Sequence, residues 1–304
     1  MELKNKQLLL ETTNICDANC VICPRELYKR KLECMDMGLF KKIIDDAEKY
    51  KLTSIDTCGY GEALLDKHLF QRLAYIRKKL PLADIFVSTT AFHLTPEKWE
   101  AACHHIDTLK LSIYGATKET YEAFHRGKLK YEVAMDNIMG FLEYAKQKKV
   151  KPYTVGLFVI TDLNIHEKFM WIRQWENKLD EIFVWKPHNW VLGRNYRTVD
   201  LARQVTCGRP DNGPMYVRTD GTVGPCCWDI HGDIQLGDLT TQTIEEVYRG
   251  EPYQKLRRNH KDRNFDDYIC KNCDQTNFDP TVLVHKSRED RKVGQLTANM
   301  RDLI

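Results

Sequence analysis

The chain has 304 residues, of which 42% are hydrophobic and 29% charged, a composition that fits a globular protein and excludes collagen-like or disordered chains. Its 46 basic and 43 acidic residues leave a formal net charge of only +3, which is too small for general binding to a nucleic-acid backbone. No apolar run approaches the roughly 18 residues of a membrane-spanning helix, and the N-terminus lacks a signal peptide, so we expect a cytoplasmic protein with no membrane partner.

The first 186 residues alternate short apolar runs with longer helical patterns. Strands are expected at residues 8–11, 54–57, 85–88, 109–113, 153–160 and 181–185. Each is followed by a stretch long enough for a helix, and βα units of this kind build a parallel sheet with right-handed crossovers. The pattern alone leaves open whether the sheet is a barrel or a doubly wound sheet.

After residue 186 the composition changes to proline, glycine, asparagine and closely spaced cysteines. We expect a linker at 187–206, a second domain at 207–277 and a polar tail at 278–304. A hairpin is predicted to turn at Asp220 and Gly221. Because this second domain has few large aliphatic side chains, a metal group is expected to stabilise it.

Eleven cysteines stand out in a chain that is expected to stay in the cytoplasm. The cytoplasm keeps thiols reduced and the number is odd, so disulfide bonds are a poor explanation. The cysteines therefore indicate metal or redox chemistry.

Three of them, Cys16, Cys20 and Cys23, directly follow the first expected strand. On a helix this spacing would form a stripe of small buried residues, but Asn14 and Pro24 favour a loop wrapped around a metal group. Three thiolates are one fewer than the four that complete an iron–sulfur cluster, whereas structural zinc sites prefer a closed fourth ligand. The trio therefore indicates a cluster with one iron open to another ligand.

The spacing Cys16-x3-Cys20-x2-Cys23 resembles the signature of radical S-adenosylmethionine (SAM) enzymes. The resemblance implies a partial (β/α)6 TIM-like barrel, a four-iron, four-sulfur (4Fe–4S) cluster on these cysteines, and SAM bound to the open iron. It further implies a one-electron reductant such as flavodoxin or ferredoxin, and a 5′-deoxyadenosyl radical that takes hydrogen from the substrate. Ile22 occupies the position of the aromatic residue that usually contacts the adenine.

Other segments resemble the SAM-binding segments of the same family. Residues 59–62, Gly-Tyr-Gly-Glu, resemble the segment that contacts the SAM amino group, which assigns this role to Gly61 and Glu62. Ser112 and Arg126 resemble the serine and arginine that hold the SAM carboxylate and ribose. Taken alone, each could instead be an ordinary turn or a solvated side chain.

A second set of cysteines, Cys207, Cys226, Cys270 and Cys273, lies in the C-terminal segment. Their order resembles the SPASM or twitch extension of radical SAM enzymes. The resemblance implies a small cysteine-rich domain with a second 4Fe–4S cluster, in which every iron has a protein ligand. A structural zinc ribbon is the main alternative, because Cys-x2-Cys occurs in both kinds of site.

Two further cysteines are candidate catalytic thiols. Cys58 ends the second expected strand, and Cys227 adjoins an expected cluster ligand. Either thiol could return a hydrogen atom to a substrate radical and invert a stereocentre, although simple packing explains Cys227 equally well. Without such a donor, a net two-electron oxidation is expected, with the electron passing to the auxiliary cluster.

The substrate is the least determined feature of the sequence. Few residues precede the first strand, which leaves no room for a leader-peptide domain and favours a small molecule such as a carbohydrate or aminocyclitol. Polar and aromatic residues at 186–197 are candidate substrate contacts. The alternatives are a peptide-modifying radical SAM maturase and a non-catalytic iron–sulfur or zinc protein that carries electrons or acts as a sensor.

Overall fold

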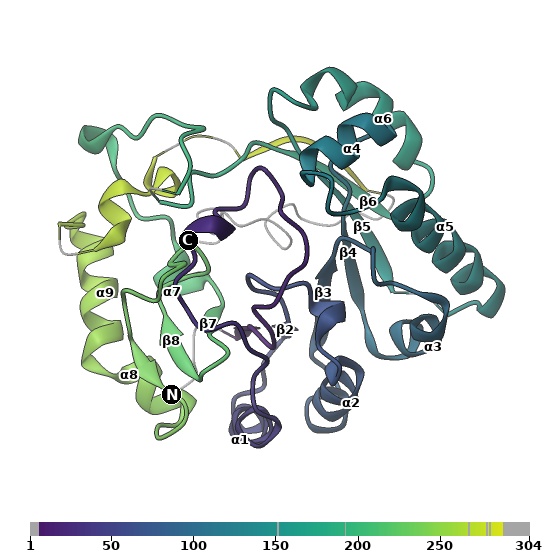
Figure 1. Ribbon diagram of the computed structural model, residues 1–304. Helices are drawn as coiled ribbons and strands as arrows, with labels where there is room; N and C mark the ends of the chain where they lie inside the picture. The colour runs from purple at the N-terminus through teal and green to yellow at the C-terminus, as the bar shows by residue number, and fades with distance from the viewer. Residues whose placement is uncertain are drawn as a thin grey trace.

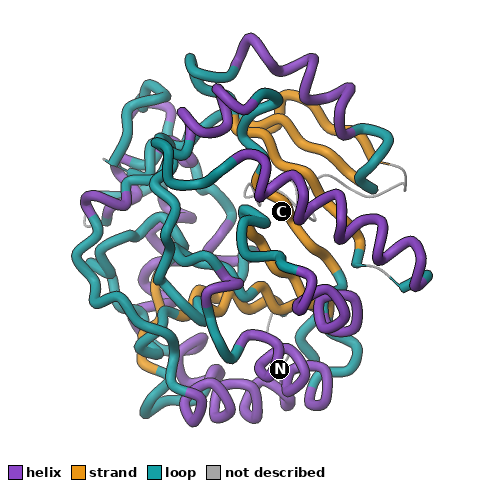
Figure 2. The backbone as a smooth tube through the Cα atoms, turned by 45° about the vertical axis from the view of Figure 1, so that its right-hand side comes forward, coloured by secondary structure: helices purple, strands orange, loops and turns teal. Residues whose placement is uncertain are grey.

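A single curved sheet runs through both halves of the chain and carries helices on its outer side in the computed structural model (Figures 1 and 2). The structure describes residues 6–150, 152–191, 193–266, 268–277, 279 and 281–287. Within these residues the sheet has ten strands in the order β10-β6-β5-β4-β3-β2-β1-β7-β8-β9. None of the helices described combines the length and apolar character needed to cross a membrane.

The first half is a partial barrel of six parallel strands that are neighbours in chain order. The strands are β1 (Gln7–Leu10), β2 (Ser54–Asp56), β3 (Asp84–Thr89), β4 (Thr108–Ser112), β5 (Tyr153–Val159) and β6 (Glu181–Trp185). The helices between them are α1 (Met37–Ala47), α2 (Leu69–Lys79), α3 (Pro96–His105), α4 (Lys118–Phe124), α5 (Tyr131–Lys148) and α6 (Lys168–Trp175). The expected βα units and the parallel sheet are confirmed.

Local sequence explains how these helices begin and which face they bury. Asp36 caps α1, because its side chain accepts hydrogen bonds from the backbone amides of Gly38 and Leu39 at 2.8 and 3.0 Å. The same helix buries Phe40 and Ile43 against the sheet. Helices are therefore held on the outer side of the barrel by apolar packing, which leaves the inner side of the sheet to form a site.

The second half continues the barrel sheet instead of forming a separate one. Strand β7 (Met215–Val217) pairs in parallel with β1, β8 (Thr222–Gly224) pairs antiparallel with β7, and β9 (Gly237–Asp238) pairs antiparallel with β8. The predicted hairpin is confirmed, with Gly221 in the left-handed region at a φ of 89°. The helices of this half are α7 (Arg209–Asn212), α8 (Ile244–Arg249) and α9 (Glu251–Asp262).

Residues 281–287 differ from the polar tail expected at 278–304, and residues 288–304 of that tail lie outside the described residues. Val282–Ser287 form β10, which pairs antiparallel with β6 at the edge of the sheet. His285 bonds to the buried Glu181 of β6 at 2.5 Å, and Val284 packs against the core. A short apolar run and a buried charge partner therefore order this part of the tail.

Candidate active site

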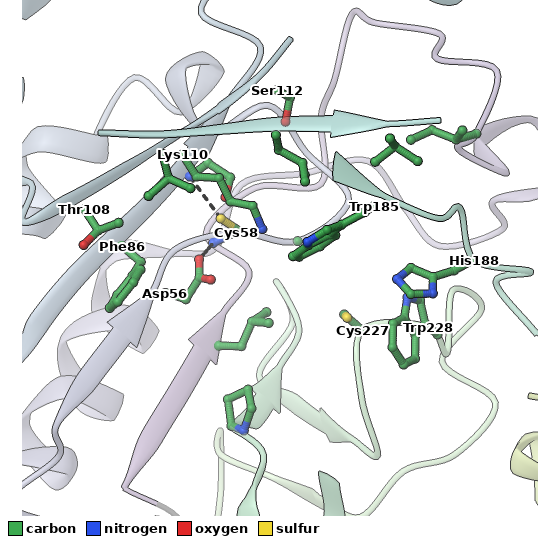
Figure 3. Close-up of a pocket in the computed structure, with 18 of the residues that line it drawn as sticks. Asp56, Cys58, Phe86, Thr108, Lys110, Ser112, Trp185, His188, Cys227 and Trp228 are labelled. Atoms are coloured by element: carbon green, nitrogen blue, oxygen red, sulfur yellow. Dashed lines mark hydrogen bonds between the residues drawn. The ribbon is translucent and has the colours of Figure 1, made fainter. Parts of the chain in front are cut away.

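A pocket of about 350 Å³ lies on the inner side of the barrel, between the two halves of the chain (Figure 3). The alternation of side chains along the strands creates it, because successive residues of a strand point to opposite faces. Leu109 and Leu111 of β4 are fully buried in the core, whereas Lys110 and Ser112 line the pocket. The same alternation places Ile55 of β2 in the core.

The three cysteines that follow β1 lie in a loop without regular helix, which we call the cysteine loop (residues 11–24). The predicted loop is confirmed. Its backbone is held from within, where the amide of Cys23 bonds to the carbonyl of Cys20 at 3.0 Å. It is also held by α4, whose Phe124 carbonyl accepts from the amide of Val21 at 2.9 Å.

Two arginines hold the cysteine loop against its neighbours. Arg194 donates to the carbonyl oxygens of Val21, at 3.0 Å, and of Cys23. Arg25 donates to the carbonyl oxygens of Asn14, at 3.0 Å, and Tyr60, at 2.9 Å. Arg194 lies among the residues expected to contact substrate, but its bonds assign it to positioning this loop.

Burial disfavours the charged form of the thiols in the cysteine loop. Burial raises the pKa of Cys16 to about 12, and it also raises the pKa values of Cys20 and Cys23. The positive charges of Arg25 and Arg194 act in the opposite direction on Cys23. Binding iron removes these protons, so a positively charged metal core would relieve the cost of burying three thiolates.

Gly61 and Glu62, which the resemblance assigns to the SAM amino group, lie against the cysteine loop. The amide of Glu62 donates to the carbonyl of Ile15 at 2.9 Å. The carboxylate of Glu62 is buried, and the Thr89 and Thr90 hydroxyls donate to it at 2.5 and 2.9 Å. These threonines at the end of β3 fix the carboxylate next to the loop.

Replacing Gly61 with alanine is expected to destabilise the fold by about 1–3 kcal/mol, the usual cost of overpacking. A Cβ atom there would lie 2.3 Å from the carbonyl oxygen of Thr13, so the cysteine loop would have to move. Denaturant unfolding of Gly61→Ala measures the loss. The control is Gly127→Asn, at an exposed left-handed position with open space around it. Equal stability of the two variants would contradict the close approach.

The other three residues assigned to SAM differ in whether they line the pocket. Ile22 and Ser112 both line the pocket. Arg126 is exposed, does not line the pocket and has a φ of 51°. Its charge helps to lower the pKa of Glu26 beside the cysteine loop, which places it near the loop but outside the cavity.

The structure brings the four cysteines of the second set together. Cys207, Cys226 and Cys270 each help to raise the pKa of Cys273, which burial raises most. Arg209 lies beside them: burial raises the pKa of Cys226 to about 12, and the positive charge of Arg209 acts in the opposite direction. Its guanidinium is buried over the ring of Trp228 at 4.3 Å, and its Nε has no hydrogen-bond partner among the described residues. A buried cation with an unsatisfied Nε fits an anionic cluster held by the cysteines.

Each set supplies only cysteine thiols, the ligands that hold the irons of a 4Fe–4S cluster. Both sets therefore fit iron–sulfur clusters.

Both candidate thiols line the pocket. Cys58 follows β2, where its Sγ accepts from the amide of Ser88 at 3.1 Å. Cys227 lies on the opposite side (Figure 3). The Tyr60 hydroxyl donates to the carbonyl oxygen of Cys227 at 2.5 Å. Burial raises the pKa values of both Cys58 and Cys227, so both remain thiols at neutral pH.

Sequence reasoning missed three charged residues of the pocket: Arg209 of the second half and, on the strands, Asp56 and Lys110. The signal of the two strand residues was a charged residue inside an otherwise apolar strand, at the position that alternates with the core. Of the residues at 186–197, His188 and Trp190 do line the pocket. Arg197 instead donates to the carbonyl oxygens of neighbouring Pro187 and Lys186, at 2.7 and 3.1 Å.

Comparisons with known proteins agree with this geometry. The family model of the radical SAM superfamily matches residues 10–170, and the SPASM model, an iron–sulfur cluster-binding domain, matches residues 207–274. The S-adenosyl-L-methionine-dependent 2-deoxy-scyllo-inosamine dehydrogenase of Niallia circulans is 23% identical over 273 residues, which cover 87% of this chain and 90% of the dehydrogenase.

Solved structures show the same fold. BtrN in complex with AdoMet and 2-DOIA matches with a TM-score of 0.65 and 18% identity, over 90% of this chain and 94% of BtrN. SuiB of Streptococcus suis bound to the precursor peptide SuiA matches with a TM-score of 0.67 and 14% identity, over 83% of this chain and 66% of SuiB. The chain therefore belongs to the radical SAM superfamily and carries a C-terminal SPASM domain, a pair of domains that implies 4Fe–4S clusters and SAM as cofactors.

Proposed function

We propose that this enzyme oxidises a secondary alcohol of a small cyclic molecule, with an aminocyclitol or a carbohydrate as the favoured substrate. The observation that carries the proposal is that one pocket adjoins both cysteine sets, through Ile22 beside Cys23 and through Cys227 beside Cys226. The similarity to an aminocyclitol dehydrogenase over 87% of the chain supports the same reaction.

The chain's own residues provide the surroundings that such a reaction needs. When bound, SAM on its cluster supplies the radical that takes a hydrogen atom from carbon, and the second cluster supplies an acceptor for the electron that oxidation leaves behind. Val155, Leu157 and Trp185 form an apolar wall that excludes water from the reacting carbon. Cys16, Cys20 and Cys23 would hold the first cluster, and Cys207, Cys226, Cys270 and Cys273 the second. A one-electron reductant such as flavodoxin or ferredoxin would serve the first cluster.

Epimerisation is the second candidate, and a specific observation favours it. Cys58 and Cys227 both line the pocket, and the raised pKa of each keeps its hydrogen on sulfur. Only the protonated thiol can donate a hydrogen atom. A peptide substrate is a further alternative, because SuiB binds a precursor peptide.

Deuterium transfer tests the reaction class. The reduced enzyme is incubated with SAM and 2-deoxy-scyllo-inosamine that carries deuterium on its carbinol carbons. Oxidation predicts deuterium in 5′-deoxyadenosine and a product lighter by one deuterium and one proton, in the wild type and in Cys58→Ala and Cys227→Ala alike. An epimer in which one deuterium has been replaced by hydrogen, lost in one of these variants while 5′-deoxyadenosine still forms, would establish epimerisation instead. Deuterium-free 5′-deoxyadenosine without product would exclude this substrate.

A further inference from the structure

The inner side of the barrel has two chemically different walls. Strands β2, β3 and β4 contribute a mainly polar wall, made of Ser54, Asp56, Ser88, Thr108, Lys110 and Ser112 together with the ring of Phe86. Strands β5 and β6 contribute an apolar wall, made of Val155, Leu157, Val159 and Trp185. Figure 3 shows Asp56, Lys110 and Trp185 directed into the space between these walls.

The charges of Asp56 and Lys110 are not paired with each other. Elsewhere in the described chain, buried charged side chains form direct ion pairs, as Arg72 does with Asp66 at 2.8 Å and Arg218 with Asp229 at 2.7 Å. Asp56 instead accepts from the backbone amide of Cys58 at 2.9 Å, and no ion pair joins it to Lys110 among the described residues.

The Lys110 ammonium contacts the ring of Trp185, at 4.3 Å from the ring centre. Burial lowers the pKa of Lys110 and raises the pKa of Asp56, so each charge carries a desolvation cost that the other does not remove. The pocket thus contains a cationic hydrogen-bond donor, Lys110, and an anionic hydrogen-bond acceptor, Asp56, with a gap between them.

A ligand that fills this gap must suit both charges. A simple anion would be repelled by Asp56, and a simple cation by Lys110 and by Arg209, which also lines the pocket. A hydroxyl group donates to a carboxylate and accepts from an ammonium group, so adjacent hydroxyl or amino substituents on one ring satisfy both. The C–H face of such a ring packs well on the indole of Trp185.

We propose that Asp56 and Lys110 are the substrate-recognition pair for the substituted edge of a cyclic polyol or aminocyclitol, whose C–H face packs on Trp185. This inference rests on the proposed function, because it names the substrate class of that same pocket. It assigns a binding role to two residues that lie outside both cysteine sets and outside the segments that resemble SAM-binding motifs.

The test is calorimetric binding to the cluster-loaded enzyme with SAM and no reductant, so that no turnover occurs. The probes are 2-deoxy-scyllo-inosamine, scyllo-inositol and the zwitterion glycylglycine. Asp56→Asn and Lys110→Met keep the shape of each side chain and remove its charge. We expect each substitution to weaken binding of the two cyclic probes about tenfold or more. In the double variant, the loss of affinity should be smaller than the product of the two single losses.

Iron content and SAM affinity of the variants show that fold and clusters persist. The control pair is Asp45→Asn and Lys79→Met, which removes an ion pair of 2.9 Å outside the pocket and should leave probe binding unchanged. Wild-type-like binding by both pocket variants would overturn the proposal. So would a wild type that binds neither cyclic probe, or that binds glycylglycine alone.

Failure of this inference and failure of the proposed function give different results. If the variants lose probe binding but the reduced wild type transfers no deuterium, recognition stands and the oxidation fails. If deuterium is transferred while the pocket variants bind like the wild type, the oxidation stands and the recognition pair is wrong.

Discussion

Cys16→Ala is expected to lower reductive cleavage of SAM by more than about a hundredfold, since changes to outer-shell residues of metal sites already cost 10–100-fold. The reason is that Cys16, Cys20 and Cys23 lie in one loop and would supply all the protein ligands of the first cluster. With one thiolate missing, the cluster loses an anchor as well as the geometry that leaves one iron open. The measurement is 5′-deoxyadenosine released by the anaerobically reconstituted, reduced protein.

Cys103→Ala is the matched control for this loss. Cys103 is buried in α3 and belongs to neither cysteine set, so its replacement removes a thiol without removing a ligand. It should leave SAM cleavage at the wild-type level. If Cys16→Ala cleaves SAM as fast as Cys103→Ala does, the first cluster does not depend on the cysteine loop.

Cys273→Ala is expected to separate SAM cleavage from product formation. Its thiol is buried beside Cys226 and Cys270, whose charges add to the effect of burial in raising its pKa, so its removal should empty the second site only. For an oxidation, product should fall more than about a hundredfold, while 5′-deoxyadenosine continues to form. Product and 5′-deoxyadenosine are measured in the same reaction with 2-deoxy-scyllo-inosamine.

Two outcomes would contradict this account of the second set. Unchanged product would show that the reaction needs no acceptor at the auxiliary site, which favours epimerisation. Equal loss of product and of 5′-deoxyadenosine, with half of the iron retained, would show that the second set supports the first site and not the substrate reaction.

Much of the fold follows from local patterns. Runs such as residues 109–113 and 181–185 are predicted correctly because their apolar, β-prone side chains lie between clear helical segments. The pairing of β7 with β1 is not predictable in this way, since it joins residues 8–10 to residues 215–217 through no local signal. Strand β10 was missed because a run of three apolar residues is too short to stand out from a polar tail.

The site shows the same division between local and long-range information. The cysteines of both sets follow from spacing, which is a property of the sequence alone. The positions of Asp56 and Lys110 depend on which face of the sheet each strand turns inward, and that becomes definite only when register is known. Arg194 contacts Cys23 across the two halves of the chain, and Arg209 lies beside Cys226 within the second half. Neither contact is local in sequence, so these roles could be assigned only from the structure.

The most direct test of the account is Mössbauer and electron paramagnetic resonance spectroscopy of the anaerobically reconstituted protein, with and without SAM. We predict about eight iron atoms per chain in two 4Fe–4S clusters, and a signal of the reduced protein that SAM alters in the wild type but not in Cys16→Ala. Zinc bound at both cysteine sets, or cluster signals that SAM leaves unchanged, would contradict the assignment of a cluster with an open iron to the cysteine loop.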